Sequence, residues 1–398
     1  MPAMPLPSLP LSLRLSLFYT AYFLVIGIQL PFWPVWLESR GMAPAEIGLV
    51  LSVSLWVRIV TIPVAGVVVV RTGNRRGALI VLSASSLAAS LIYPPIDGFW
   101  PILLVTVLVS AFFSPVMNLG DNLTLLIARA NRLDYGRMRL WGSISFIAAA
   151  GLGGVTAAAL GPESVLYLLI GGIALTAAAA CLLPKPPSKP ASPPLAGTAG
   201  RGRVMVLMTD PAFLLFLGAT AAIQSSHAVY YAFGTLHWRE LGHSEAVIGW
   251  LWAEGVIAEV LLFAFGTALG ARLSPARLLM VAGLAGLVRW TGTAMAETVP
   301  ALAVLQVLHA LTFGAAHLAA MQYIARAIPI DRSATAQALY GALATGMCTA
   351  LAMILAGAAY DRLHAGAYFT MAAMAAVGVG LALLLTMRER PEPLPADA

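Results

Sequence analysis

Residues 133–160 read LDYGRMRLWGSISFIAAAGLGGVTAAAL. Two arginines, Arg137 and Arg139, stand near the start of this stretch, and residues 140–160 contain no charged side chain. A run of about 20 predominantly apolar residues is what an α-helix needs to cross the hydrocarbon core of a bilayer. The stretch therefore predicts a membrane-spanning helix with a positively charged mouth.

The composition of the whole chain points to the same solvent. Of its 398 residues, 60% are hydrophobic and only 10% are charged, and the mean hydropathy is +0.87. Soluble domains carry roughly 25% charged residues, so this much apolar surface must face lipid. The net charge of +6 does not indicate a nucleic-acid partner, because the positive residues are spread over many loops. We expect an integral membrane protein whose environment is the lipid bilayer.

The sequence contains no pattern typical of an enzyme. Metal-ligand spacings, phosphate-binding loops and nucleophile elbows are all missing from it, and its two cysteines, Cys181 and Cys348, lie in apolar segments that imply no disulfide framework. We therefore expect no catalytic site, no metal and no cofactor.

Twelve apolar segments are long enough to be spans. They lie near 12–36, 45–70, 77–95, 100–128, 137–160, 163–183, 210–238, 245–270, 276–295, 299–326, 333–358 and 363–387. Between the sixth and the seventh, Pro184–Arg203 (PKPPSKPASPPLAGTAGRGR) has the composition of a flexible linker. The predicted fold class is an all-α membrane protein with twelve transmembrane helices in two pseudo-symmetric six-helix bundles. The bundles are 1–183 and 210–387, with a linker at 184–209 and a tail at 388–398.

The positions of lysine and arginine predict the sidedness. Eighteen of the 23 lie at the termini, in the linker and in one alternate set of loops, whereas only Arg40, Arg239 and Arg362 lie in the other set. Positive residues collect in cytoplasmic loops, so we expect both termini and the linker in the cytoplasm. The scarcity of lysine and the abundance of alanine are typical of a GC-rich bacterial genome, and hence of a bacterial inner-membrane protein.

The two halves repeat one another in part. The segment AEIGLVLSVSLWVR (45–58) aligns with AVIGWLWAEGVIAE (246–259), which places Arg58 opposite Glu259. Each half also has a glycine followed by a basic loop, GVVVVRTGNRRG (66–77) and GTALGARLSPAR (266–277). These loops resemble the loop signature of the major facilitator superfamily, although Val70 occupies the position of its usual acidic residue.

Several ionisable side chains lie inside or at the mouths of spans, where a charge costs roughly 2.5–3.5 kcal/mol. They are Arg58, Asp121, Arg139, His227, Glu254, Glu259, Arg289, His309 and His317. A rise of about 1.5 Å per residue places Glu254, Arg289 and His309 at one depth, where they can form a charge-balanced cluster. We expect Asp121 and Arg139 to meet near the loop at 130–136. Such groups either pair permanently as struts or bind substrate and protons.

Aromatic residues near these charges are candidates for binding a ring. Phe146 lies seven residues beyond Arg139 on the same helix face, which suits an aromatic carboxylate: a guanidinium for the acid and an arene for the ring. Tyr230, Tyr231 and Trp252 are further candidates. The alternative for each is ordinary packing or a place in the interfacial belt. The candidate substrate site is completed by Arg58, Asp121 and His227.

The opening segment LDYGRMRLWGS resembles the region between spans 4 and 5 of the phenylpropionate permease family of the major facilitator superfamily. The resemblance continues, in order, through IQLPFWPVWL (28–37), HAVYYAFGTLHW (227–238), GWLWAEGVIAEV (249–260), LVRW (287–290) and VLHALTFGAAHLAAMQYI (307–324). It covers nearly the whole chain. It implies proton-coupled import of 3-phenylpropionate or a similar aromatic acid.

The chain resembles the lactose–proton symporter family more distantly. That resemblance implies substrate-binding roles for Asp121 and Arg139, and it matches Glu254, Arg289 and His309 to the acid, the arginine and the histidine of spans 8 to 10. Thr312 stands where that family has its proton-carrying acid. The proton must then be carried elsewhere, and we favour Glu259, with Glu254 as its rival and Arg289, His309 and His317 completing the proton-coupling set.

The sequence thus predicts a monomeric symporter that alternates between outward-open and inward-open states, with protons and a small aromatic acid as its partners. Asn118, Gln224 and Gln322 leave open a sugar or nucleoside proton symporter. A multidrug exporter and a non-transporting sensor on the same fold are further alternatives.

Overall fold

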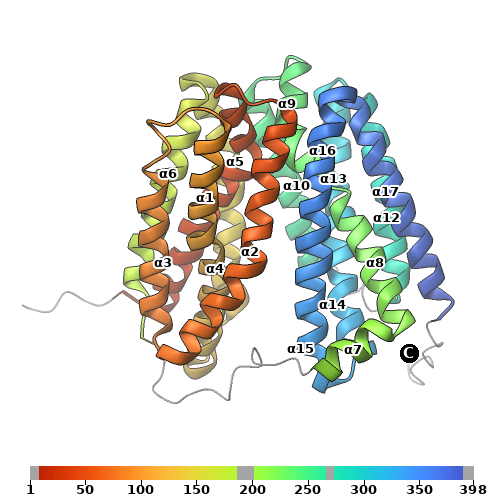
Figure 1. The fold of residues 1–398 in the computed structure, drawn as a ribbon, viewed down its shortest axis with the longest axis horizontal. Coiled ribbons are helices and arrows are strands. Elements are labelled where there is room, and N and C mark those ends of the chain that lie inside the picture. The colour runs from red at the N-terminus through yellow and green to blue at the C-terminus, as the bar shows by residue number, and fades with distance from the viewer. Residues whose placement is uncertain (1–8, 186–200, 266–272, 389–398) are drawn as a thin grey trace, which may run out of the picture. The chain divides into compact units, whose positions relative to one another are not determined.

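Helices account for nearly all of the described residues of the computed structural model, which are 9–185, 201–265 and 273–388 (Figure 1). These residues contain no strand. They form two compact units, of which unit 1 is Met1–Gly197, Tyr230–Val256 and Met353–Asp361 and unit 2 is Thr198–Val229, Ile257–Ala352 and Arg362–Ala398. Every predicted span coincides with a helix or a run of helices. Within the predicted segments, 266–270 of the eighth span, 186–200 of the linker and 389–398 of the tail lie outside the described residues.

Ten helical segments among the described residues are long and apolar enough to cross a membrane. This number is consistent with twelve predicted spans for two reasons. One segment, Ile330–Thr386, has 57 residues, which is ample for two crossings at about 20 residues each. The helix that matches the third span, Arg75–Ser90, has only 16 residues and is shorter than a typical span.

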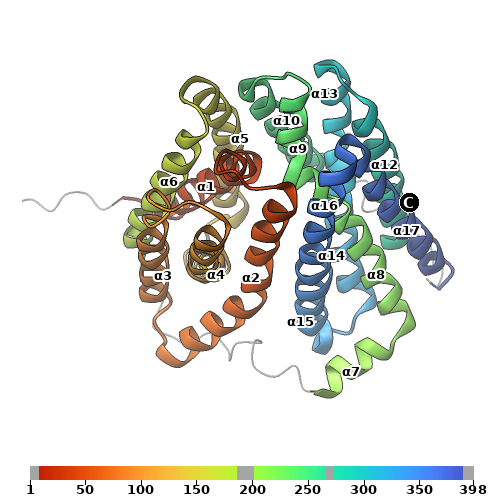
Figure 2. The ribbon, with the colours of Figure 1, turned by 45° about the horizontal axis from the view of Figure 1, so that its top comes forward.

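Six helices make up most of unit 1: α1 (Leu11–Ser39), α2 (Pro44–Thr72), α3 (Arg75–Ser90), α4 (Phe99–Asn131), α5 (Tyr135–Leu160) and α6 (Glu163–Leu182). Helix α1 packs against α5 and α6, α4 packs against α2 and α3, and α3 also contacts α6, as the second view shows (Figure 2). Helix α5 begins where it does because the Asp134 side chain accepts a hydrogen bond from the backbone N–H of Arg137 at 3.2 Å, as an N-cap residue does. Arg137 is itself exposed and pairs with Asp134.

Helices α1 and α5 approach closely at a glycine. A Cβ atom on Gly27 would lie 2.7 Å from the carbonyl oxygen of Phe146 and 2.9 Å from the Cβ of Ala149. The absence of a side chain at Gly27 therefore sets the separation of the two helices. Phe146 is buried at this level of α5, with 6% of its surface exposed.

Unit 1 also includes parts of α9 (Ala228–Glu240), α10 (Glu245–Phe265) and α16 (Thr349–Leu363). Glycines bring two of these segments against the first six helices. Gly48 on α2 faces the backbone of Met353, and Gly357 on α16 faces the backbone of Pro44, each so closely that a Cβ would lie within 3 Å of a carbonyl oxygen. The two contacts are reciprocal. Gly48 lies four residues after Pro44, whose carbonyl faces Gly357, and Gly357 lies four residues after Met353, whose carbonyl faces Gly48.

Helices α5 and α10 meet in the same way. Gly154 faces the carbonyl oxygen of Glu245, and Gly249 faces that of Ala150. Two ion pairs join α9 to its neighbours: Arg239 at the end of α9 lies 2.6 Å from Glu38 of α1 and 2.9 Å from Glu245 of α10. Small residues that let backbones approach are the usual means of packing helices in a bilayer.

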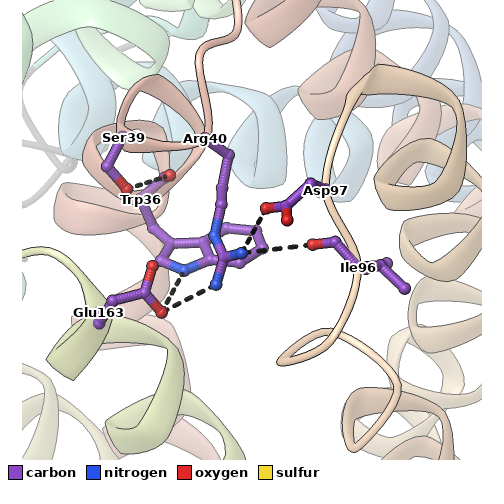
Figure 3. Close-up of polar contacts among 6 residues, drawn as sticks. All are labelled: Trp36, Ser39, Arg40, Ile96, Asp97 and Glu163. Carbon is purple, nitrogen blue, oxygen red and sulfur yellow. Dashed lines mark hydrogen bonds and ion pairs between the residues drawn. The ribbon is translucent and has the colours of Figure 1, made fainter.

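A polar cluster at the end of α1 ties together three elements of unit 1 (Figure 3). Arg40 donates to Asp97 in the α3–α4 loop at 2.6 Å and to Glu163 at the start of α6 at 2.9 Å, and its guanidinium lies 5.0 Å from the Trp36 ring centre. Desolvation works against the charged form of Arg40, but the hydrogen bonds and charges of Asp97 and Glu163 outweigh it and raise the pKa of Arg40. The cluster holds the end of α1, the α3–α4 loop and the start of α6 together.

Unit 2 is built from the remaining helices together with the end of α10 from Ile257 and short pieces of α9 and α16. The remaining helices are α7 (Arg201–Thr209), α8 (Pro211–Ser225), α12 (Pro275–Met295), α13 (Val299–Val307), η1 (Ala310–Ala315), α14 (Ala316–Ala327), α15 (Ile330–Leu339), η2 (Tyr340–Cys348), η3 (His364–Gly366) and α17 (Ala367–Thr386). Helix α17 packs against α12 and α8, while η1 and α14 pack against α12. The segments η1 and η2 are π-helical. Such wide turns are rare and occur frequently at functional sites.

The glycine contact between α1 and α5 makes a testable prediction. Gly27→Ala forces a methyl group against the α5 backbone, and overpacking of this kind costs about 1–3 kcal/mol. We expect a lower unfolding temperature of the purified protein in detergent. The matched control is Gly171→Ala on α6, where a Cβ meets nothing within 4 Å and where alanine favours the helix. Equal unfolding temperatures for the two variants would contradict the packing account.

Candidate functional site

The site in unit 2 is organised around Arg289 of α12, whose surface is fully buried. One terminal nitrogen donates to His309 Nδ1 at 3.0 Å and to Thr312 Oγ1 at 2.9 Å, and the other donates to Gln306 Oε1 at 2.7 Å. The guanidinium carbon also lies 4.6 Å from the centre of the Trp290 ring. A buried charge is tolerated only when it is well provided with hydrogen bonds, and these neighbours supply them.

The contact with Arg289 decides the protonation of His309. A guanidinium has donors and no acceptor, so Nδ1 of His309 must accept, and the proton of the neutral ring lies on Nε2. That nitrogen lies 3.6 Å from Oε2 of Glu259 on α10. His309 therefore stands between a cation that holds it neutral and a carboxylate toward which its N–H points.

The tautomer of His227 follows from the same reasoning. Its Nδ1 lies 3.2 Å from the carbonyl oxygens of Ile223 and Gln224, which can only accept, so Nδ1 carries the proton. Its Nε2 lies 3.1 Å from Thr312 Oγ1 and accepts the hydroxyl proton. The Thr312 hydroxyl thus accepts a hydrogen bond from Arg289 and donates one to His227, so the donors run from Arg289 through Thr312 to His227.

Glu259 is the carboxylate of this cluster among the described residues. Its side chain is 20% exposed, whereas both histidines are buried and engaged. A Cβ on Gly314 would lie 3.6 Å from Cγ of Glu259 and 2.8 Å from Cδ2 of Leu262, so the glycine in η1 lets α10 approach and bring Glu259 to His309. Glu259 is therefore more accessible than the two histidines of the cluster.

Glu254 has a different environment. It is half-buried and belongs to unit 1, where it makes no hydrogen bond or ion pair of its own with any described residue. The sequence matched Glu254 to Arg289 and His309 by depth, but the structure brings Glu259 next to His309 instead.

His317 lies two turns beyond His309 along the same span. The ring of Phe313 lies between them, 5.4 Å from His309 with a 9° angle between the planes and 6.5 Å from His317 with a 7° angle. His317 is half-buried, and Glu259 lies close enough to act on it electrostatically.

A second cluster lies in unit 1. Asp121 on α4 accepts hydrogen bonds from the hydroxyls of Tyr19 at 2.6 Å and Tyr135 at 2.9 Å. The guanidinium of Arg139 on α5 lies 4.0 Å from the ring centre of Phe23 and 5.6 Å from that of Tyr19. Asp121 and Arg139 therefore share Tyr19, and within the described chain no ion pair joins them directly.

Arg58 belongs to the same region of unit 1. The Tyr22 hydroxyl lies close enough to Arg58, Asp121 and Arg139 to interact electrostatically with all three. These three charged side chains are half-buried, whereas Tyr22 is buried. Two arginines and one tyrosine-bound aspartate thus lie in the same region as the buried Tyr22.

The predicted aromatic residues of α9 and α10 form a packed group. Tyr230 and Trp252 are each 2% exposed and stack with ring centres 4.3 Å apart. Trp252 donates from its indole nitrogen to Thr235 at 3.0 Å. Tyr231 is half-buried and is the accessible ring of these three.

Several contacts of the two clusters were not anticipated from the sequence. Gln306, Tyr19 and Phe23 were not singled out, although Gln306 is a polar residue inside a span and lies three residues before His309. Tyr135 stands in the opening stretch itself. From the sequence, Thr312 was recognised only as the residue in place of an acid. Its hydrogen bonds to Arg289 and His227 depend on the fold around η1 and could not be read from residue spacing.

The fold and the buried polar clusters define a membrane transporter of the major facilitator superfamily. The sequence matches the MFS_1 like family over residues 12–371, and the chain belongs to that family. It is similar to the nucleoside transporter NupG, whose crystal structure superimposes with a TM-score of 0.84 at 16% identity over 95% of this chain and 99% of that one. The predicted fold class is confirmed, and the relatives are transporters rather than enzymes.

Sequence relatives are similar over almost their full length. The chain is 33% identical, over 91% of its length and 94% of the relative, to a probable 3-phenylpropionic acid transporter of Escherichia coli (strain K12). It is 28% identical to the maltose permease of Geobacillus stearothermophilus, over 89% of each chain. It is 22% identical to the lactose permease of Klebsiella oxytoca, over 78% of this chain and 79% of that one. The two resemblances predicted from the sequence are confirmed.

The Thr312 hydroxyl makes a testable prediction. Thr312→Val keeps the shape of the side chain but leaves a donor of Arg289 and the Nε2 atom of His227 without their partner, and each stranded buried group costs about 1–3 kcal/mol. We expect the variant to unfold at a lower temperature in detergent. Thr312→Ser retains the hydroxyl and is the control. Equal stability of the two variants would show that the hydroxyl does not hold the cluster.

Proposed function

We propose that this protein is a proton-coupled symporter that imports an aromatic carboxylate, such as 3-phenylpropionate, across the bacterial inner membrane by alternating access. Both termini lie in the cytoplasm in this proposal, in keeping with the asymmetry of lysine and arginine. The observation that carries the proposal is the position of Glu259 beside a histidine that a buried arginine keeps neutral. Such a carboxylate is the one titratable group of its cluster that can bind and release a proton.

The coupling follows from the cost of moving charge. An ionised carboxylate in a span is unfavourable by a few kcal/mol, and protonation of Glu259 removes that charge. A carrier with a neutral Glu259 and a bound substrate reorients more readily than one with a bare carboxylate. Proton binding thereby favours the step that carries the substrate across.

The substrate class follows from the Arg139 cluster. Two tyrosine hydroxyls satisfy Asp121, so the positive charge of Arg139 is available to a carboxylate on the substrate. Phe23 covers one face of the guanidinium, which leaves its N–H edge for a carboxylate and an aromatic neighbour for the ring. The Escherichia coli relative, named as a probable 3-phenylpropionic acid transporter, supports this class.

Alternating access requires some helix contacts to open. The reciprocal glycine contacts of α2 with α16 and of α5 with α10, together with the pairing of Arg239 with Glu38, are the contacts that we propose to separate when the carrier reorients. Backbone contacts at glycines bury little side-chain surface, so they can form and break with small changes in free energy.

A sugar or nucleoside proton symporter is the second candidate. It is favoured by the relatives named maltose permease and lactose permease and by the buried amides of Gln224 and Gln306. Competition separates the candidates: unlabelled 3-phenylpropionate should reduce uptake of the labelled acid, and maltose or uridine should leave it unchanged. The reverse pattern would establish the second candidate.

The role of Glu259 is tested by transport in proteoliposomes. With an inward proton gradient, the wild-type protein should accumulate labelled 3-phenylpropionate. Glu259→Gln cannot release a proton, so we expect it to lose accumulation while it still exchanges labelled for unlabelled substrate. Glu254→Gln is the matched control and should accumulate substrate normally. If Glu254→Gln loses accumulation and Glu259→Gln retains it, the proton carrier is Glu254.

The role of Arg139 is tested by removing its positive charge. Arg139→Gln removes the positive charge, and we expect the half-saturating concentration of 3-phenylpropionate to rise roughly tenfold or more, the loss of one charge-assisted hydrogen bond. Arg137→Gln removes a positive charge from the exposed loop nearby and is the control. Equal effects of the two substitutions would mean that Arg139 acts only through the general surface charge.

A further inference from the structure

We infer that His317 is a second proton-binding residue, which takes the proton from Glu259 and releases it at the end of unit 2 nearest the linker. This inference rests on the proposed proton coupling and adds the route by which the proton leaves. It assigns different roles to the two histidines of the span: His309 positions Glu259, and His317 carries the proton.

His309 is unsuited to carrying the proton. Its Nδ1 faces a guanidinium donor of Arg289 at 3.0 Å, so a second proton on that nitrogen would place two donors face to face beside a full positive charge. His309 is also buried, with 7% of its surface exposed. A proton on Glu259 therefore cannot leave through His309 while Arg289 keeps its place.

His317 meets the requirements that His309 does not. It is half-buried rather than buried, and Glu259 lies close enough to interact with it electrostatically. Helix α8, which packs against α14, has no titratable side chain, and the arginine of α12 at this cluster is bonded to His309. On the next helix, Asp331 and Arg332 pair with each other.

Glu259 lies beside the span that carries the two histidines, at the level of η1. Glu259 packs against Gly314, five residues after His309 and three before His317. In an α-helix, residues eight apart would point about 80° away from each other, but the π-helical turn of η1 changes that register. As a result, His309, Phe313 and His317 form a nearly parallel column of rings, and one rotation of the Glu259 side chain can turn it from one imidazole toward the other.

The direction of release follows from the chain. Helix α14 carries His317 near its start, ends at Ala327 and is followed by α15, which contacts α7 in the last part of the linker segment 184–209. His317 is thus two turns nearer to the linker end of unit 2 than His309 is. In the transfer, the O–H bond of protonated Glu259 breaks and an N–H bond forms on His317, directly or through one water. The imidazolium then gives its proton to water at that end, and neutral His317 is restored.

The test is substrate-driven acidification inside proteoliposomes that contain a trapped pH-sensitive dye. His317→Gln removes the acceptor but keeps a polar side chain of similar size. We expect the variant to acidify the interior roughly 10²-fold more slowly than the wild type when 3-phenylpropionate is added outside, in line with the loss of a proton-transfer group. Exchange of labelled for unlabelled substrate requires no proton release and should continue at the wild-type rate. His243→Gln, in the α9–α10 turn, is the matched control.

Normal exchange by His317→Gln also shows that the variant is folded. Acidification at the wild-type rate would overturn the inference, because another route would then carry the proton. Loss of exchange in parallel with acidification would also overturn it, since His317 would then act on reorientation rather than on proton release. Absence of acidification by the wild-type protein would be a failure of the proposed function itself.

Discussion

The buried guanidinium of Arg289 is the interaction on which the second unit depends. A permanent charge inside a membrane span must be surrounded by acceptors, and here they are an imidazole nitrogen, a hydroxyl and an amide oxygen. Because the guanidinium can only donate, the Nδ1 atom of His309 and the Thr312 oxygen accept from it. The carbonyl oxygens of Ile223 and Gln224 fix the tautomer of His227, and we propose that the Glu259 carboxylate is the group that gains and loses a proton.

The first unit solves the same problem with different chemistry. There the half-buried acid accepts hydrogen bonds from two tyrosine hydroxyls, and the arginine beside it lies against aromatic rings. Among the described residues, no ion pair joins Asp121 to Arg139. We propose that one unit changes its protonation and the other presents a positive charge, as a proton-coupled carrier of an organic anion requires.

The sequence was a good guide to the helices and a partial guide to the site. Spans could be predicted within a few residues because length and hydropathy are local properties. The cluster of Arg289 and His309 was also anticipated, since depth in the membrane can be counted from helix ends. The choice between Glu254 and Glu259 as the partner of His309 was not accessible in this way, because it depends on the rotation of α10 and on the approach that Gly314 allows.

The sequence alone determined that this protein lies in a membrane, that its chain crosses repeatedly in two halves, and that its ionisable residues gather in a few spans. Hydrophobicity and charge act residue by residue, so a linear pattern is enough to read them. Only the tertiary structure decided which polar groups of unit 2 share hydrogen bonds. The directions of those bonds depend on backbone carbonyls at the end of α8 and on side chains from α10 and α12, which are far apart in the sequence.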